Sequence, residues 1–307
     1  MKMRTILFWS AMAMAFAMVA APAHAQGQAA PDFSKVEIKT TKLGNSFYTL
    51  EGQGGTVGVL VGPDGVFMVD DQFAPLSAKL MAAIKQVSDQ PVRFLVNTHV
   101  HPDHTGGNEN FGKAGAIIFA REELRDRLMH PNPAANGTPG VPAPAAALPL
   151  VTYEGILKLH INGEVVELIP IPRAHTDGDT MIYFPGLDII MTGDFYRSIQ
   201  YPNIDRANGG TLSGLLDGLG VVIGLAGPNT KIVPGHGPVV SRAEVMANRD
   251  MVLAVRDHVA QLIAQGKTQD EVLAANPTSE YDARVPNSKE TTQRFVTQLY
   301  AELKPGK

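Results

Sequence analysis

Hydrophobic and polar positions alternate over short stretches in the first part of the chain, which predicts strands rather than helices. These stretches cover residues 36–40, 46–51, 56–61 and 65–70, and glycine-rich turns separate them. From residue 75 to residue 87 the spacing becomes helical, because Leu76, Leu80, Ile84 and Val87 fall on one face. An apolar strand over residues 93–97 follows directly.

A second group of strands and helices repeats this order. It follows a strand at 116–120, a helix at 121–129 and the Pro- and Ala-rich residues 130–150, which are either a linker or a loop beside an active site. Its elements are strands at 153–161 and 164–171, joined across Asn162-Gly163, strands at 180–184 and 188–192, a helix at 211–226 and a strand at 231–233. Strands followed by helices, twice, predict an α/β fold of two αβ halves with face-to-face sheets and outer helices.

The last part of the chain reads as helices. They cover residues 242–265, 268–275 and 288–303, and Thr268 and Glu271 form a capping box at the start of the middle one. Neither a repeat nor a separate domain is visible there. We therefore expect one domain over residues 26–240, with the helices of residues 241–307 packed on it.

The first residues have the pattern of a secretory signal. Lys2 and Arg4 precede an apolar run over residues 6–19, and Ala23-His24-Ala25 follows it. The run is shorter than the roughly 20 residues that a membrane-spanning helix needs. We expect a signal peptide over residues 1–25, cleaved after Ala25, and a periplasmic or secreted mature chain without an integral membrane segment.

Composition limits the classes of molecule that the protein is expected to bind. The 26 basic and 30 acidic side chains give a formal net charge of −4, and the charges are dispersed, so we expect a small-molecule substrate and no nucleic acid. The sequence indicates no oligomeric state. There is no cysteine, which excludes disulfides and thiolate ligands, so any bound metal ion must be held by nitrogen and oxygen.

The most informative residues come directly after the strand at 93–97. They are His99-Val100-His101-Pro102-Asp103-His104. Residues two apart in an extended segment point the same way, so His99 and His101 can reach one metal ion while Asp103 and His104 face a second. Imidazole and carboxylate are the ligands that Zn²⁺ accepts when thiolate is absent.

Three further residues of the same type, His175, Asp194 and His236, lie at the ends of predicted strands. Glycines nearby allow the backbone to turn tightly and present each side chain to one centre. Seven ligands exceed the need of one tetrahedral ion. They suit two ions that share a bridging ligand.

With these motifs the sequence resembles the metallo-β-lactamase superfamily. The resemblance rests on HVHPDH at 99–104, the His175 and Asp194 motifs, PGHG at 234–237 and the acidic turn Val69-Asp70-Asp71. It implies an αββα sandwich and two Zn²⁺ per chain, although other divalent metals also suit N/O ligands. In the implied site His99, His101 and His175 hold one ion, Asp103, His104 and His236 hold the other, and Asp194 bridges them.

The resemblance also implies roles for two aspartates. Asp70 would brace the ligand loop, as carboxylates often orient ligating imidazoles, and an ordinary turn residue is the alternative. A metal-bound hydroxide would attack a carbonyl, with Asp103 orienting the water or taking its proton as the catalytic residue. His130, His160 and His258 match no motif.

The substrate is the least determined feature. Export and the His104 position, which also occurs in the cysteine-free β-lactamase subclass, make β-lactam antibiotics the leading prediction. Asp194 in a Gly-Asp turn resembles hydroxyacylglutathione hydrolases, so the alternative is a periplasmic thioesterase, lactonase or esterase. An alternative of another class is a non-catalytic metal-dependent binding protein.

The loop after Asp194, residues 195–210, is the candidate substrate wall. It carries Tyr196, Arg197, Tyr201 and Arg206. An arginine there can pair with a substrate carboxylate, and the alternative is a solvated surface arginine.

Overall fold

Two β-sheets lie at the centre of the fold. In the computed structural model, which describes residues 32–133 and 136–304, the first sheet has the order β1-β2-β3-β4-β5-β6-β7 and the second the order β12-β11-β10-β9-β8. The signal peptide expected at residues 1–25 lies outside the described residues. Among the residues that are described, no helix combines the length and apolar character needed to cross a membrane.

The first sheet and its helices come from the first half of the chain. Strands β1 to β4 form an antiparallel meander, and β4 to β7 run parallel. The strands are β1 (Lys39–Lys42), β2 (Phe47–Glu51), β3 (Val57–Leu60), β4 (Val66–Val69), β5 (Val92–Val96), β6 (Ile117–Arg121) and β7 (Val151–Tyr153). The helices are α1 (Ser77–Lys85), α2 (Pro102–Thr105), α3 (Asn108–Lys113) and α4 (Glu122–Met129).

The second sheet is antiparallel except for the parallel pair β11 and β12. Its strands are β8 (Leu157–Ile161), β9 (Glu164–Pro170), β10 (Thr180–Phe184), β11 (Ile189–Met191) and β12 (Lys231–Val233). The helices that follow are α5 (Leu212–Leu225), α6 (Arg242–Ala264), α7 (Gln269–Ala274) and α8 (Ser288–Leu303).

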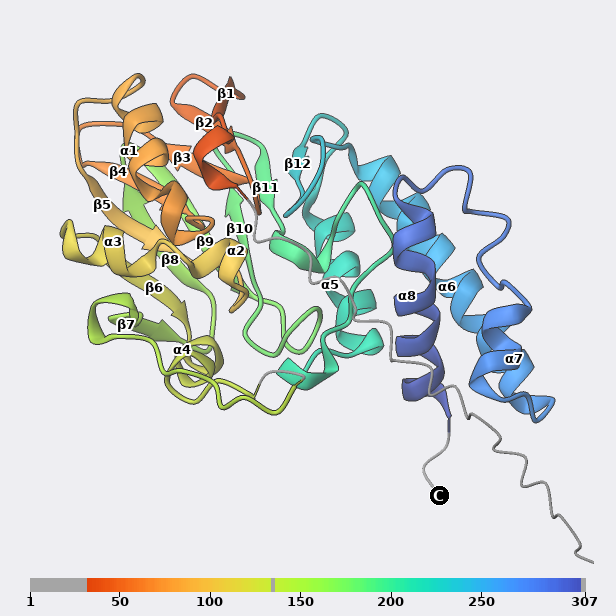
Figure 1. The fold of residues 1–307 in the computed structure, drawn as a ribbon. Helices are drawn as coiled ribbons and strands as arrows, with labels where there is room; N and C mark the ends of the chain where they lie inside the picture. The colour runs from red at the N-terminus through yellow and green to blue at the C-terminus, as the bar shows by residue number, and fades with distance from the viewer. Residues whose placement is uncertain (1–31, 134–135, 305–307) are drawn as a thin grey trace, which may run out of the picture. The chain divides into compact units, whose positions relative to one another are not determined.

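Side-chain alternation along the strands explains the layers. In β4, Val66 and Met68 pack with Leu80 and Ile84 of α1, while Phe67 and Val69 point to the second sheet. Apolar residues on the other face of the second sheet share a cluster with α5, α6 and α8. Figure 1 shows α1 and α3 on one side of the two sheets and α5, α6 and α8 on the other. The αββα arrangement predicted from the sequence is confirmed.

One local expectation was wrong, and two short helices were missed. Residues 153–161 form two strands rather than one: β7 ends in the first sheet at Tyr153 and β8 begins in the second at Leu157. Alternation is the same in both strands, so periodicity does not reveal the crossing at residues 154–156. The short helices α2 and α3 were not predicted, because α2 has 4 residues and α3 has 6, too few to set up a helical period.

Candidate metal centre

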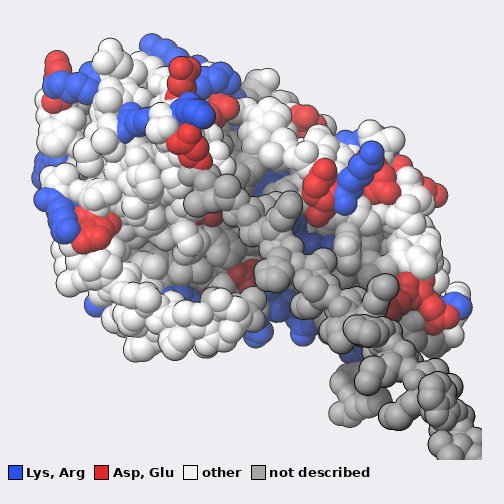
Figure 2. Space-filling view, viewed as in Figure 1, with Lys and Arg blue, Asp and Glu red and all other residues white. Residues whose placement is uncertain are grey.

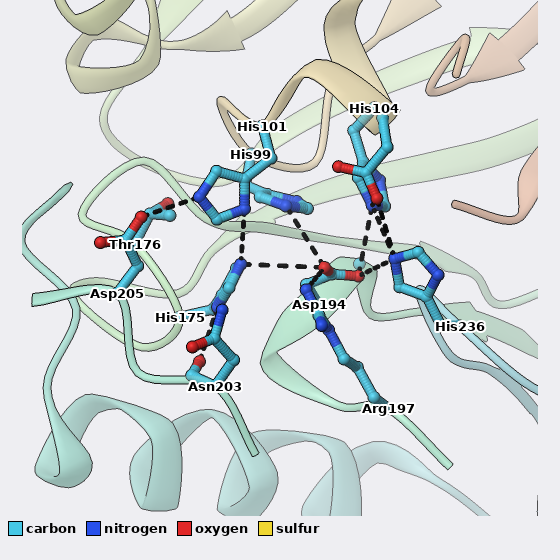
Figure 3. Close-up of polar contacts among 12 residues, drawn as sticks. His99, His101, His104, His175, Thr176, Asp194, Arg197, Asn203, Asp205 and His236 are labelled. Carbon is cyan, nitrogen blue, oxygen red and sulfur yellow. Dashed lines mark hydrogen bonds and ion pairs between the residues drawn. The ribbon is translucent and has the colours of Figure 1, made fainter. Parts of the chain in front are cut away.

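The seven predicted ligands converge in the structure (Figure 3). They come from the segments that follow β5, β9, β11 and β12, and two of them, Asp103 and His104, lie in α2. They form two groups, and within each group the ligand atoms lie within 4.8 Å of one another. The first group is His99, His101, His175 and Asp194, and the second is Asp103, His104, Asp194 and His236.

Asp194 belongs to both groups, and each of its oxygens faces one of them. Oδ2 lies 3.6 Å from Nε2 of His99 and 3.8 Å from Nε2 of His175. Oδ1 lies 3.3 Å from Nε2 of His104 and also 3.3 Å from Nε2 of His236. A carboxylate placed in this way can bridge two ions.

The backbone next to Asp194 leaves no room for a side chain at Gly193 or Gly235. Asp194 lies in a 3₁₀ turn, Gly193–Phe195, directly after β11, and Gly193 has φ 55°. A Cβ at Gly235, next to His236, would lie 2.0 Å from Oδ1 of Asp194. The glycines of the Gly-Asp and Pro-Gly-His motifs therefore let the two loops pack against each other at the centre.

Unpartnered polar atoms show that this donor set suits metal ions. Nε2 of His99 and Oδ1 of Asp194 are buried and have no hydrogen-bond partner among the described residues. Nδ1 of His101 and Nε2 of His175 lie 2.9 Å apart. Buried polar groups without partners are costly, and a cation between them would satisfy them without a thiolate.

Asp70 supports the loop that carries the first candidate ligands through two hydrogen-bond contacts. Its Oδ2 lies 2.7 Å from Nδ1 of His104, and its Oδ1 accepts a 2.7 Å hydrogen bond from the backbone N–H of Thr98. Asp70 is 1 % exposed and has φ 58°, so its left-handed turn carries a buried carboxylate to the ligands. Of the two readings of Asp70, the structure favours the bracing role over an ordinary turn residue.

Three supporting residues were missed by the sequence analysis. Oδ2 of Asp205 lies 2.8 Å from Nε2 of His101, and the backbone oxygen of Asn203 lies 2.6 Å from Nδ1 of His175. Oδ2 of Asp179 accepts a hydrogen bond from the backbone N–H of His175 at 2.6 Å. The Asp-Gly-Asp sequence after His175 is a signal for Asp179, whereas Asn203 and Asp205 lie in a loop without a motif.

Burial and charge set the protonation of the imidazoles in opposite directions in the two groups. Burial, followed by the nearby histidine His104, holds the pKa of His99 well below its usual value. Burial also lowers the pKa of His175 to about 3. Both rings are therefore neutral at pH 7 and can act as ligands without losing a proton.

The second group is dominated by carboxylates. Burial opposes the charged form of His104, but Asp194 and Asp70 outweigh it and raise its pKa well above the usual value. The pKa of His236 is raised in the same way, by Asp194 and by a contact with Asp103. Burial acts against the charged form of Asp103, yet its bond with His236 lowers the pKa of Asp103 to about 2.

The structure contradicts one residue of the candidate substrate wall. Tyr201 is fully buried, stacks on Phe295 at 5.5 Å and lies 2.8 Å from Asp282, so it belongs to the core and not to a substrate wall. Arg206 is exposed. Arg197 forms an ion pair with Asp194, and its side chain is 12 % exposed.

Of the segment 130–150, residues 131–133, 141 and 143 contribute to a cavity beside His101, which favours the active-site loop over the linker. The cavity has a volume of about 420 Å³, and its lining includes His101 and Asp205 as well as Pro131, Pro133 and Val141. Val141 is 86 % exposed at the rim of this cavity. The volume of this cavity is within the range of small-molecule binding sites.

Comparisons with known proteins agree with this architecture. Residues 50–244 match the family model described as the metallo-beta-lactamase superfamily. The chain is 23% identical over 252 residues to a linear primary-alkylsulfatase from Pseudomonas sp. (strain ATCC 19151), covering 69% of this chain and 48% of that protein. The chain spans about half the length of the curated relatives that it matches.

Solved structures share the fold. The sec-alkylsulfatase Pisa1 from Pseudomonas sp. superposes with a TM-score of 0.63 at 16% identity, covering 88% of this chain and 52% of that one. A metallo-beta-lactamase from Pontibacter korlensis superposes with a TM-score of 0.56 at 21% identity, covering 71% of this chain and 99% of that one. With the family match extending over more than half of its length, the chain belongs to the metallo-beta-lactamase superfamily of hydrolases.

Proposed function

We propose that this chain is an exported hydrolase that holds two zinc ions and cleaves small-molecule esters. The observation that carries the proposal is the placement of Asp194, whose two oxygens face two separate groups of ligands. A binding protein needs no such bridge between two ions, whereas paired ions with a shared ligand suit hydrolysis.

The residues of the centre have different proposed roles. His99, His101 and His175 would hold one ion, and Asp103, His104 and His236 the other, with Asp194 shared. When bound, two divalent ions lower the pKa of a shared water and polarise the bond to be cleaved. The side chain of Asp103 is 22 % exposed and lies 3.2 Å from Nε2 of His236, so its carboxylate is accessible to water, which it can orient or from which it can accept a proton.

Zinc is favoured by the type of ligand. The centre contains five imidazoles and two carboxylates and no thiolate, a set that zinc accepts in hydrolytic sites. Manganese and iron also bind nitrogen and oxygen. Metal analysis of the purified protein therefore belongs to the test of this proposal.

The substrate class is proposed from relatives in sequence and from the site. A relative that matches 69% of this chain carries the name linear primary-alkylsulfatase. The substrate named there is an ester of sulfate. The cavity beside His101 is lined by apolar residues such as Leu128 and Val141, which suits the hydrocarbon part of an ester. Sulfate esters and carboxylic esters are the first substrates to test.

β-Lactam hydrolysis is the second candidate, and it was the leading prediction from the sequence. The reason to test it is that a solved metallo-beta-lactamase has this scaffold over 99% of its own length. At 21% identity that likeness shows the fold alone.

Export is proposed from the sequence pattern of residues 1–25, with Lys2 and Arg4 before the apolar run and Ala23-His24-Ala25 after it. Mass spectrometry of the protein from a periplasmic fraction tests this part. A mature N-terminus at Gln26 supports it, and an uncleaved chain in the cytoplasm contradicts it.

The activity test is a panel of substrates with and without a chelator. It contains an alkyl sulfate, a carboxylic ester, a thioester, a lactone and a chromogenic cephalosporin, measured beside the Asp194→Ala variant. We expect zinc-dependent turnover of an ester that the chelator and the variant both abolish. Turnover of the cephalosporin alone would replace the ester proposal with the β-lactam candidate, and bound metal without any turnover would indicate a binding protein.

A further inference from the structure

Two side-chain amides connect the segment after α4 to a predicted metal ligand. Nδ2 of Asn132 donates to Oδ1 of Asn208 at 3.0 Å, and Nδ2 of Asn208 donates to Oδ2 of Asp205 at 2.6 Å. The same oxygen of Asp205 lies 2.8 Å from Nε2 of His101 (Figure 3). A continuous series of contacts therefore runs from Asn132 to a histidine of the first ligand group.

Asn208 contacts both oxygens of the Asp205 carboxylate. Asp205 caps the short 3₁₀ helix Arg206–Asn208, and the backbone N–H of Asn208 donates to Oδ1 at 3.2 Å. The side chain of Asn208 holds Oδ2, the oxygen that faces His101. Without this side chain the backbone bond to Oδ1 would remain, and Oδ2 would be free to turn away from the imidazole.

Further contacts fasten this short helix to α4 and to the segment after it. Nδ2 of Asn132 also donates to the backbone oxygen of Ala207 at 2.9 Å, across 75 positions of the sequence. Arg127 of α4 forms a 2.6 Å ion pair with Asp177, whose backbone N–H donates to the backbone oxygen of Asn208 at 2.9 Å. The placement of the helix therefore depends on residues far away in the sequence.

These amides lie at the surface of the site rather than in the core. Asn132, Asp205 and Asn208 all line the cavity beside His101. Asn132 is exposed, and Asp205 and Asn208 are partly buried. Loss of one amide therefore leaves the packed core intact and changes only how firmly the carboxylate is held.

We propose that Asn132 and Asn208 are positioning residues, which hold Asp205 against His101 and thereby raise the affinity of the first ligand group for its metal ion. A carboxylate that orients a ligating imidazole strengthens it as a ligand, and an amide that orients the carboxylate acts one step further out. This inference rests on the metal centre of the proposed function and deepens it. It makes the segment after α4 a part of the protein that controls metal loading.

Zinc affinity of the full chain, measured without substrate by competition with a chromogenic chelator, tests this proposal. We expect Asn208→Ala to weaken the binding of one ion about fivefold and Asn132→Ala about threefold, in the range for a lost hydrogen bond. Asp205→Ala identifies that ion as the one held by His101. In the Asp205→Ala background, Asn208→Ala should cause no further loss, because the amide acts through the carboxylate. An equal loss in both backgrounds overturns the proposal.

The matched control is Asn136→Ala, which removes an exposed amide from the same segment. Oδ1 of Asn136 accepts a 3.0 Å hydrogen bond from the backbone N–H of Thr138, within its own turn. This variant should change both zinc affinities by less than about twofold. A merely structural role of Asn208 would weaken both ions alike, and that result also overturns the proposal. If Asn208→Ala does not fold, the exposed Asn132→Ala decides the question in the same cycle with Asp205→Ala.

The two proposals fail in different ways. Selective loss of affinity for one ion in Asn208→Ala and Asn132→Ala, in a protein that hydrolyses nothing in the panel, keeps the positioning role and rejects the hydrolase. Zinc-dependent turnover of an ester, with zinc affinities in both variants equal to those of Asn136→Ala, keeps the hydrolase and rejects the positioning role.

Discussion

Asp205 follows His101 by 104 positions in the chain, yet its Oδ2 lies 2.8 Å from Nε2 of that histidine. The other ring nitrogen, Nδ1, faces Nε2 of His175 at 2.9 Å. The carboxylate thereby fixes the ring so that Nδ1 points into the first group of ligands. Asp205 is itself held by Asn208, whose side-chain amide donates to Oδ2 at 2.6 Å.

Asp205→Asn should weaken zinc binding by the first group about 10- to 100-fold, because a carboxylate that orients a ligating imidazole also raises its basicity. Competition with a chromogenic chelator measures the affinity. Asp217→Asn, on the exposed face of α5, is the control for the loss of one negative charge. Equal zinc affinity in the Asp205 variant and the control would show that the contact has no role in metal binding.

The convergence of the candidate ligands could be predicted from the sequence, because they follow strands and most have glycines nearby. The run from His99 to His104 and the Asp194 and His236 motifs each mark the end of a strand, where loops meet at the sheet edge. Asp205 could not be predicted, since its loop has no period and its position depends on contacts across the sandwich. Tyr201 shows the opposite error: a loop aromatic that was expected at the substrate lies in the core.

Charge on the surface added little to the prediction. On the face shown in Figure 2, basic and acidic side chains are interspersed. The charges that matter for the site are instead the few buried ones, such as Asp70 and Asp194, which are 1 % and 2 % exposed. Composition cannot reveal these, because burial of a charge depends on the tertiary fold.

Gly235→Ala should remove zinc from the centre. The new Cβ would lie 2.0 Å from Oδ1 of Asp194 and 2.6 Å from the backbone of Gly193, so the bridging carboxylate must move. Zinc content and turnover are the measurements. Gly220→Ala in α5, where a Cβ meets nothing within 4 Å, is the control and should be stabilised by about 0.5–1 kcal/mol. Full zinc content in Gly235→Ala would contradict the tight packing of the two loops.

Neighbouring aspartates should respond differently to substitution. Asp70→Ala leaves His104 and Thr98 without their buried partner and should destabilise the protein by about 3–5 kcal/mol. Burial raises the pKa of Asp71 well above its usual value, so Asp71→Asn replaces a carboxyl group whose charged form is already disfavoured and should cost less than about 1 kcal/mol. Urea unfolding of the zinc-loaded proteins compares them, and similar losses in both variants would contradict this assignment.

Zinc loading should depend on pH differently in the two groups. In the metal-free protein His99 and His175 have lowered pKa values, so they are neutral at pH 7 and bind zinc without releasing protons. His104 and His236 have raised pKa values because carboxylates surround them, so they carry protons that zinc must displace. Affinity for the second ion therefore rises with pH through the neutral range, and acidification removes that ion first.

Zinc titrations at pH 7, in buffers with different ionisation enthalpies, report the protons released by each equivalent. We expect little release with one equivalent and clear release with the other. His236→Gln is the comparison, because it removes one protonated ligand of the second group and should reduce the release from that equivalent while leaving the first unchanged. Equal proton release for both equivalents, in the unmodified protein and in the variant, would show that the carboxylates around the second group do not control its protonation.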